Sequence, residues 1–291
     1  MAGRGLTASL IASKFVATGN DFLFIDERVP NSRSEDRPEL VRALCDRHWG
    51  VGADGVVFVE NSKTPGQLKW DFYNRDGSPA EMCGNASRCM GRWAEINLPN
   101  TLSNNQPNNQ PNNLSSQSIR FETVAGVVEA KVLGEEIEVF LSGVKATSRE
   151  VAFEVVGRKQ VAHFINTGVP HFVLAIPSIA TPPNLKETVS ALRFHPTAGA
   201  GGANVTFLEL HGAKEFAAVT FERGVEDFTL SCGTGVVAAA AVGLRLQNSN
   251  DREANIETPG GRLSVEFSDS GAVLRGPAEF LFEVRIDRWR A

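Results

Sequence analysis

The feature of this sequence that most constrains its fold is an internal repeat in which matching residues lie 149 positions apart. The pairs that keep this separation are Phe15 and Phe164, Thr18 and Thr167, Gly19 and Gly168, the runs 56–60 and 205–209, Phe72 and Phe221, and Cys83-Gly84 and Cys232-Gly233. Self-similarity at a fixed separation indicates that each copy is one structural unit. We therefore expect a chain of two similar halves.

Beyond the cysteines the separation falls to 135 positions, because FETVAG at 121–126 matches IETPGG at 256–261. The first half has therefore gained about fourteen residues, and an Asn-rich tract lies in the same interval, near 100–118. Such a polar, Pro-interrupted tract has almost nothing apolar to bury. We expect it to be a flexible surface insertion with no catalytic part.

The predicted secondary structure follows the repeat. In each half, short runs rich in Phe, Val and Ile precede one helix, expected over 85–96 and over 233–247, and a strand meander with Gly turns follows it. A smaller helix is expected over 37–48, with Pro38 in its first turn. Many strands with one central apolar helix predict an α/β (α+β) fold of two pseudo-symmetric domains, each a curved, mostly antiparallel sheet or barrel around that helix.

The repeat also predicts the domain boundaries. The first domain is expected over residues 1–146 and carries Cys83, and the second over 147–291 and carries Cys232. Two positions stay open for the last strand: it belongs to the second domain or returns to the first.

Composition narrows the class of partner. The 29 basic and 34 acidic residues give a net charge of −5, and no dense Lys/Arg run occurs, which argues against nucleic acid or an anionic membrane. No apolar run is long enough for a signal peptide or a membrane span. We expect a cytoplasmic protein that acts on a small molecule.

The four cysteines lack the spacing of a zinc site or a thioredoxin-type motif. A structural disulfide framework is not expected without a secretory signal. Cys45 and Cys89 are interpreted as buried hydrophobes. For Cys83 and Cys232 three interpretations stay open at this point: small residues at a turn, a redox pair, or an acid/base pair.

The position of Cys83 and Cys232 favours the acid/base interpretation. A cysteine at a helix N-terminus lies beside backbone N–H groups and the positive end of the helix dipole, which favours the thiolate. If the two halves face each other, one thiolate could remove an α-hydrogen from an amino acid while the opposite thiol returns a proton, without a cofactor. The helix amides would then stabilise the carboxylate as negative charge develops on it.

Several blocks, in order along nearly the whole chain, resemble the diaminopimelate epimerase family. They are ATGNDF at 17–22, DRHWGVGADG at 46–55, FYNRDGSPAEMCGN at 72–85, NTGVPH at 166–171, FERG at 221–224 and CGTG at 232–235. The resemblance implies two barrel-like domains, each with a central helix, closing over a site between them. It further implies cofactor-independent interconversion of LL- and meso-diaminopimelate, a place in lysine and peptidoglycan precursor biosynthesis, and a homodimer.

The resemblance also assigns roles to the matching residues. Cys83 and Cys232 correspond to the base and acid pair, and no cofactor or metal is implied. The substrate-binding residues it implies are Asn20, Asn74, Gly84, Asn85, Asn204, Glu222, Arg223, Gly233 and Thr234, with His171 as a possible assisting residue. The chemistry of Glu222 and Arg223 agrees, because a second amino-acid head needs a carboxylate for its ammonium and a guanidinium for its carboxylate.

Three departures from the family pattern bear on substrate preference: Val169 before Pro-His, Gly55 in place of a glutamine, and Ala86 after Cys-Gly-Asn. Two rival functions follow. A related cysteine-pair racemase for another amino acid, such as histidine, would keep both cysteines and change the distal binding residues. A non-catalytic binding homologue would tolerate loss of either cysteine, and both are present.

Overall fold

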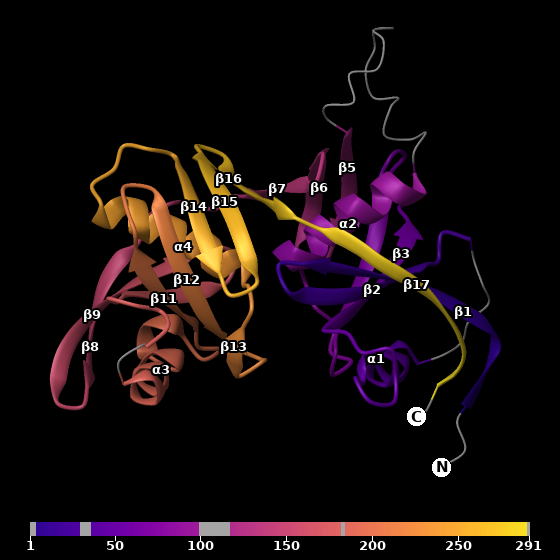
Figure 1. Cartoon of the computed structure of the whole chain (residues 1–291), viewed down its shortest axis with the longest axis horizontal. Helices are drawn as coiled ribbons and strands as arrows, with labels where there is room; N and C mark the ends of the chain where they lie inside the picture. The colour runs from indigo at the N-terminus through magenta and orange to yellow at the C-terminus, as the bar shows by residue number, and fades with distance from the viewer. Residues whose placement is uncertain (1–3, 30–35, 99–116, 182–183, 290–291) are drawn as a thin grey trace, which may run out of the picture. The chain divides into compact units, whose positions relative to one another are not determined.

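The computed structural model describes residues 4–29, 36–98, 117–181 and 184–289, which form two compact units (Figure 1). Unit 1 consists of Met1–Val139 with Pro277–Ala291, and unit 2 of Phe140–Gly276. Most of the Asn-rich insertion expected near 100–118 lies outside the described residues, and only positions 117 and 118 belong to a described strand.

Unit 1 contains strands from both ends of the chain. Its elements are β1 (Arg4–Ala17), β2 (Asn20–Asp26), α1 (Arg37–Cys45), β3 (Gly55–Asn61), β4 (Leu68–Asn74), α2 (Gly84–Asn97), β5 (Gln117–Thr123), β6 (Gly126–Leu133) and β17 (Glu279–Trp289). The strand β7 (Glu136–Ser142) carries the chain from unit 1 into unit 2.

The sheet of unit 1 runs in the order β17, β1, β2, β3, β4, β5, β6. The pairs β2–β3 and β4–β5 are parallel and the others antiparallel. The central helix α2 packs on β1, β2, β5, β6 and β17. It does so because its apolar residues recur at helical spacing: Ala86, Cys89, Met90, Trp93 and Ala94 are all buried.

Unit 2 repeats most of the elements of unit 1 and adds the short η1 and β13. Its elements are β8 (Arg149–Val155), β9 (Arg158–Asn166), β10 (Pro170–Ala175), α3 (Leu185–Arg193), the short 3₁₀ helix η1 (Pro196–Ala198), β11 (Asn204–Leu210), β12 (Glu215–Glu222), β13 (Asp227–Thr229), α4 (Gly233–Leu246), β14 (Glu253–Thr258), β15 (Gly261–Ser268) and β16 (Gly271–Pro277).

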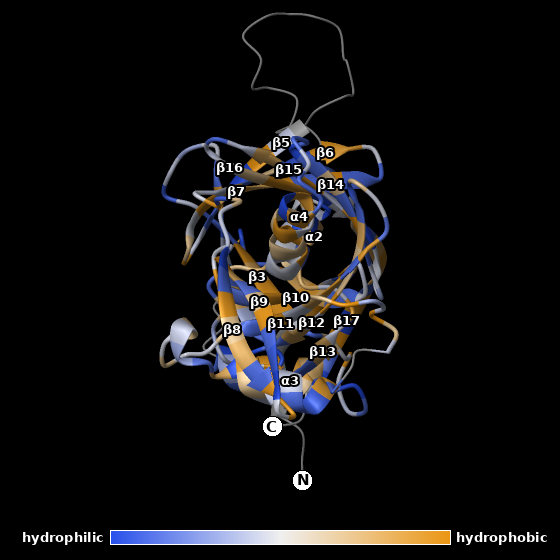
Figure 2. Ribbon diagram, turned by 90° about the vertical axis from the view of Figure 1, so that its left-hand side faces the viewer, coloured by the Kyte–Doolittle hydropathy of each residue, from blue (hydrophilic) through white to orange (hydrophobic). Residues whose placement is uncertain are grey.

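The sheet of unit 2 repeats the pairing pattern of unit 1. It runs β8, β9, β10, β11, β12, β14, β15, β16, with β10–β11 and β12–β14 parallel. The helix α4 is buried on nearly all sides by this sheet, as its run of Val and Ala residues requires, and Figure 2 shows it with strands of the sheet above and below it. The predicted α/β (α+β) architecture of two pseudo-symmetric domains, each a curved, mostly antiparallel sheet around a central helix, is confirmed.

The repeat separations reappear in the elements. A shift of 149 carries β3 onto β11 and α2 onto α4, and a shift of 135 carries β6 onto β15 and β7 onto β16. The edge of β1 is occupied by β17, just as the edge of β9 is occupied by β8. The end of the chain therefore supplies unit 1 with the strand that unit 2 receives from residues 149–155.

Four elements were not predicted from the sequence: α3, β8 and the short η1 and β13. The helix α3 buries only Thr188, Val189, Leu192 and Arg193, and two of these four residues are polar. The repeat itself holds the signal, since α1 at 37–45 shifted by 149 falls on 186–194. The strand β8 alternates buried and exposed residues and follows an irregular segment, and it too was not expected.

Candidate active site

Each central helix begins directly after one of the two candidate catalytic cysteines. Cys83 is the N-cap of α2 and Cys232 the N-cap of α4, both with extended backbone, and neither side chain caps its helix. Their carbonyls accept from Ser87 N and Val236 N, each at 2.8 Å. The thiols are therefore carried at the positive ends of two helix dipoles, where a thiolate is stabilised.

The predicted carboxylate-binding amides occupy the first turn of these helices. They belong to Gly84 and Asn85 in α2 and to Gly233 and Thr234 in α4. The geometry of an α-helix leaves its first N–H groups without an intrahelical partner, so they are suited to an anion. Asn85 is 1% exposed, so its side chain is buried in the first turn of α2.

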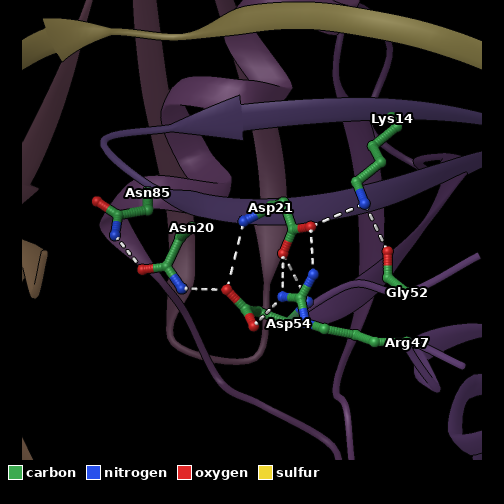
Figure 3. Close-up of polar contacts among 7 residues, drawn as sticks. All are labelled: Lys14, Asn20, Asp21, Arg47, Gly52, Asp54 and Asn85. Atoms are coloured by element: carbon green, nitrogen blue, oxygen red, sulfur yellow. Dashed lines mark hydrogen bonds and ion pairs between the residues drawn. The ribbon is translucent and has the colours of Figure 1, made fainter. Parts of the chain in front are cut away.

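In unit 1 the side chains of Asn85 and Asn20 belong to one hydrogen-bonded chain (Figure 3). Asn85 Nδ2 donates to Asn20 Oδ1 at 2.6 Å, and Asn20 Nδ2 donates to Asp54 Oδ2 at 2.9 Å. Asp54 is in turn paired with Arg47 at 2.8 Å. Two predicted binding residues are thus brought together and held by a carboxylate that the sequence analysis did not single out.

Asp21, the second residue of β2, extends this hydrogen-bonded network. Arg47 donates to both carboxylate oxygens of Asp21, and Lys14 Nζ lies 2.8 Å from Oδ2. Burial by itself raises the pKa of Asp21, but the hydrogen bonds and charges of Arg47 and Lys14 outweigh it, so that the pKa lies below its ordinary value. The carboxylate is therefore ionised at neutral pH and fixes Arg47 against Asp54.

Asn74 lies apart from this chain. It ends β4, is exposed, and donates through Nδ2 to Ser78 Oγ at 3.1 Å. The side chain of Asn74 is thus hydrogen-bonded to a residue outside the chain of Asn85, Asn20 and Asp54. A role for Asn74 in substrate binding stays a prediction.

In unit 2 His171 is fully buried at the centre of a second polar cluster. Its Nδ1 lies 3.1 Å from Thr206 Oγ1, and its Nε2 lies 3.0 Å from Thr234 Oγ1 and 3.2 Å from Asn204 Nδ2. Thr234 Oγ1 also lies 3.5 Å from Cys232 Sγ. The predicted residues Cys232, Thr234, His171 and Asn204 are therefore one contiguous group.

The hydrogen bonds fix the tautomer of His171. The backbone N–H of Arg223 donates to Asn204 Oδ1 at 2.8 Å, so the amide nitrogen of Asn204 faces the ring. Nε2 is then an acceptor and Nδ1 carries the proton, which it donates to Thr206. Burial, followed by the positive charge of Arg223, lowers the pKa of His171 to about 3, so the ring is neutral at physiological pH.

Glu222 is the last residue of β12 and Arg223 follows it, next to this cluster. Glu222 accepts from Thr229 Oγ1 at 2.5 Å, and the guanidinium of Arg223 donates to Gly202 O at 3.5 Å. The Arg223 backbone N–H donates to Asn204 Oδ1, so the residue is held through its backbone as well as through its guanidinium. Binding of a distal amino-acid head by this pair stays a prediction.

The sequence analysis missed the residues that support the predicted ones. In unit 1 these are Arg47 and Asp54, both inside the quoted block 46–55 but given no role. In unit 2 they are Thr206 and Thr220, whose hydroxyl oxygens are 3.0 Å apart. Both threonines interrupt apolar strands and are almost completely buried, and a polar residue inside an apolar run was the available signal.

The three departures from the family pattern lie in different surroundings. Ala86 is fully buried in the first turn of α2, next to Gly84 and Asn85 in the chain. A Cβ at Gly55 would lie 2.7 Å from the Phe72 ring and from the Tyr73 carbonyl oxygen, so this backbone has no room for a glutamine side chain. Val169 is half-buried, and its carbonyl accepts from Thr167 N at 3.2 Å.

The other two cysteines are core residues. Cys45 and Cys89 are buried, and burial raises the pKa of both thiols, that of Cys45 to about 12. A raised pKa keeps a thiol protonated and unreactive. Across ranges 4–29, 36–98, 117–181 and 184–289, no group of three His, Cys, Asp or Glu side chains is arranged to hold a metal ion.

Comparison with known proteins decides the family. The Diaminopimelate epimerase family matches residues 12–145 and 163–281. The chain belongs to the diaminopimelate epimerase family. As a member of that family it is an amino-acid epimerase, and hence an isomerase.

Relatives of the diaminopimelate epimerase family cover nearly the whole chain. Diaminopimelate epimerase of Aquifex aeolicus is 35% identical over 285 residues, covering 94% of this chain and 96% of the relative. The Archaeoglobus fulgidus enzyme is 33% identical over 284 residues, covering 93% and 94%. The identification from the sequence blocks is confirmed.

Solved structures share the fold at low sequence identity. A hydroxyproline epimerase from Agrobacterium vitis superposes with a TM-score of 0.67 at 14% identity, covering 97% of this chain and 94% of that one. Methylitaconate-delta-isomerase gives a TM-score of 0.65 at 12% identity, covering 96% of each chain.

Within the described ranges, no helix has the length and apolar character to cross a membrane.

Proposed function

We propose that this protein interconverts LL- and meso-diaminopimelate by transfer of the α-proton between Cys83 and Cys232, without a cofactor. The observation that carries the proposal is the equivalence of the two cysteines. Each is the N-cap of the central helix of its unit, and the same separation of 149 positions relates the cysteines and the helices. The relatives at 35% and 33% identity are named diaminopimelate epimerases, which supports the choice of substrate.

The chemistry balances without an oxidant or reductant. One cysteine reacts as thiolate and takes the α-hydrogen as a proton, and the electron pair of the broken C–H bond is delocalised into the adjacent carboxylate. The other cysteine reacts as thiol and donates its proton to the opposite face of the carbon, which forms the new C–H bond. The two cysteines finish with exchanged protonation states, so the reverse reaction uses them in exchanged roles.

The first-turn amides supply the electrostatic part of the mechanism. Gly84 and Asn85, together with Gly233 and Thr234, are proposed to donate their N–H groups to the reacting carboxylate. Negative charge that accumulates there on proton removal is stabilised by these amides and by both helix dipoles. Asn20 is proposed to bind the same end of the substrate, since it is already hydrogen-bonded to Asn85.

The distal amino-acid head is proposed to bind Glu222 and Arg223 with Asn74 and Asn204. A guanidinium binds a carboxylate through paired N–H groups, and a carboxylate binds an ammonium group. The backbone hydrogen bond from Arg223 to Asn204 supports the grouping of these two residues.

His171 is proposed to assist through Thr234. The contacts Cys232 Sγ to Thr234 Oγ1 at 3.5 Å and Thr234 Oγ1 to His171 Nε2 at 3.0 Å form a continuous path. Nε2 is an acceptor that Asn204 Nδ2 and the threonine hydroxyl share. A hydroxyl hydrogen directed at Nε2 leaves the hydroxyl oxygen to accept from the thiol. The neutral ring thus orients the hydroxyl beside Cys232 rather than adding a positive charge.

The deciding experiment is α-proton exchange in deuterated water under reducing conditions. Diaminopimelate should take up deuterium at its α-carbon together with inversion, measured by NMR and by chiral chromatography. Histidine and proline serve as comparison substrates and should show no exchange. Absence of exchange with diaminopimelate, or exchange with one of the other amino acids alone, contradicts the proposal.

Cysteine variants test the two-base scheme. Cys83→Ala and Cys232→Ala should each abolish complete epimerisation, because each removes either the base or the acid for a given direction. Cys45→Ala is the matched control, since Cys45 is a core thiol, and it should keep wild-type activity. A Cys83→Ala or Cys232→Ala enzyme with full activity would refute the scheme.

We also propose the cellular setting that the family implies. The protein acts in the cytoplasm, as a homodimer, in lysine and peptidoglycan precursor biosynthesis.

A further inference from the structure

Arg88, in the second turn of α2, is a fully buried cation whose partners are all uncharged. Its guanidinium donates to Thr18 Oγ1 and Asn85 Oδ1, both at 2.8 Å, to Pro277 O at 3.4 Å and to Gly84 O at 3.5 Å. In the part of the chain that the structure describes, none of its hydrogen-bond or ion-pair partners is a carboxylate. A buried charge without a counter-charge is costly, so its retention calls for a function.

The charge of Arg88 lies beside the helix turn that Cys83 begins. Side chains on a helix lean toward its N-terminus, and the contacts with Gly84 O and Asn85 Oδ1 show that Arg88 does so. Burial lowers the pKa of Arg88 to about 10, which leaves it a cation at neutral pH, while negative charge on Cys89 or Cys83 acts in the opposite direction. Cys89 is a buried, protonated thiol, so Cys83 is the neighbour that this cation can stabilise as thiolate.

Arg88 also fixes the orientation of two binding amides. A guanidinium can only donate, so Asn85 presents Oδ1 to Arg88 and Nδ2 to Asn20. Asn20 therefore presents Oδ1 to Asn85 and Nδ2 to Asp54, as Figure 3 shows for the three carboxylate and amide groups. Hydrogen bonds thus run with one polarity from a buried cation to a carboxylate, and both amides have a determined orientation.

On α2 and the strands packed against it, the other charged side chains that the structure describes are paired, hydrogen-bonded or exposed. They are Lys14 with Asp21, Asp26 with Arg28, Arg92 with Glu95, Arg120 with Glu129, Lys131 with Glu138, Arg285 with Asp287, Glu122 with Ser62 and Thr64, and the exposed Glu279, Glu283 and Arg288. Arg88 is distinguished from them by complete burial and by its uncharged partners.

We propose that Arg88 is a positioning residue of the active site: it orients the amides of Asn85 and Asn20 and supplies the positive charge that stabilises Cys83 as a thiolate. The inference rests on the proposed role of Cys83 as an acid/base group. Arg88 acts in two separable ways: its charge stabilises the thiolate of Cys83, and its planar set of donors orients the amides of Asn85 and Asn20.

The charge contribution is tested by the pH dependence of thiol alkylation in the full-length protein. Iodoacetamide reacts with thiolates, and peptide mass spectrometry follows Cys83 and Cys232 separately in one sample. Arg88→Gln should raise the midpoint of the Cys83 profile by about one to two pH units, the size of effect an adjacent opposite charge has on a pKa. The Cys232 profile, which belongs to unit 2, should not move.

Two controls separate this effect from a general disturbance. Arg92→Gln changes the next arginine along the same helix, which pairs with Glu95 and donates to Ala278 O at 2.9 Å, and should leave the Cys83 midpoint unchanged. An unchanged Cys83 midpoint in folded Arg88→Gln overturns the charge contribution. Equal shifts at Cys83 and Cys232 also overturn it, because a local charge cannot act equally on both units.

Arg88→Lys separates orientation from charge and serves also if Arg88→Gln does not fold. Lysine keeps the positive charge but lacks the planar donors that reach Thr18 and Asn85 together. The Cys83 midpoint should stay within a few tenths of a pH unit of wild type, while KM for diaminopimelate should rise about tenfold or more, the effect of about 1.4 kcal/mol, with a smaller change in kcat. A wild-type KM in this variant overturns the orientation contribution.

The alkylation measurement does not depend on the substrate. If diaminopimelate is not the substrate, the Cys83 midpoint still shifts in Arg88→Gln, so failure of the proposed function and failure of this inference are distinguishable.

Discussion

His171 is a titratable residue that the fold keeps neutral. The folded protein holds its pKa at about 3, whereas an unfolded chain takes up the proton near the ordinary value of 6.5. Between these values the unfolded state binds more protons, so the free energy of unfolding falls as the pH falls from 6.5 toward 3. The contribution of one such group is about 1.4 kcal/mol per pH unit. Above pH 6.5 His171 is neutral in both the folded and the unfolded state, so it contributes no pH dependence to the free energy of unfolding.

We predict that His171→Gln removes this part of the pH dependence. Glutamine retains a donor and an acceptor but does not titrate, so the slope of unfolding free energy against pH between about 4 and 6 should be smaller by about 1.4 kcal/mol per pH unit. Urea denaturation at each pH measures the slope for wild type and variant. His163 also contributes, because burial lowers its pKa, and it is present in both proteins. Identical slopes would show that His171 titrates normally in the folded state.

The residues of the site could be predicted from the sequence to different degrees. Cys83 and Cys232 could be found because the repeat places a rare residue twice at one position. Asp54 and Arg88 could not be given a role from the sequence. Each acts by binding one particular atom of a side-chain amide: Asp54 accepts from Asn20 Nδ2, and Arg88 donates to Asn85 Oδ1. That information exists only once β2, α2 and the segment before β3 are brought together in space.

Among the elements, α4 approaches its sheet closely at Gly243. A Cβ at Gly243 would lie 2.5 Å from Phe216 Cε2, and Phe216 is 2% exposed on β12. Replacement of a mid-helix glycine by alanine normally stabilises a helix by about 1 kcal/mol. Here we predict the opposite: Gly243→Ala should lower the free energy of unfolding by about 1–3 kcal/mol, because the buried ring has to move. Urea denaturation at pH 7 measures the change.

The double variant with Phe216→Leu tests the cause. Leucine removes the ring atoms that meet the new methyl group, so Gly243→Ala should be less destabilising in this background by about 1 kcal/mol. Equal destabilisation in both backgrounds would place the strain elsewhere on α4.

At the level of elements, the repeat predicted more than residue propensity did. It located α2 and α4, and the same separations relate β3 to β11 and β6 to β15. The helix α3 was missed because only Val189 and Leu192 of its buried residues are strongly apolar. Its burial comes from packing on β8 and β11, which a local pattern does not contain.

The last strand of the chain pairs with the first, and this pairing contributes to the stability of unit 1. β17 pairs antiparallel with β1, and its residues Ile286 and Trp289 belong to the core cluster of unit 1 together with Leu10. Loss of β17 would leave the edge of β1 unpaired and would remove two buried side chains, each worth about 1.5–3 kcal/mol. Unit 2, by contrast, is one continuous segment with its own edge strand β8.

We therefore predict that a chain ending at Gly276 keeps unit 2 folded and loses unit 1. Hydrogen exchange measured by mass spectrometry should show full exchange in peptides of β1 to β4 and retained protection in β9 to β12. A rearranged chain in which 277–291 is joined by a short Gly/Ser linker ahead of residue 1 should restore protection in unit 1, because Arg4 lies opposite Trp289 in the strand register. Protection of β1 to β4 in the truncated chain would mean that the core of unit 1 is stable without its C-terminal strand. Failure of the rearranged chain would mean that β17 has to be connected to unit 2 in order to pair with β1.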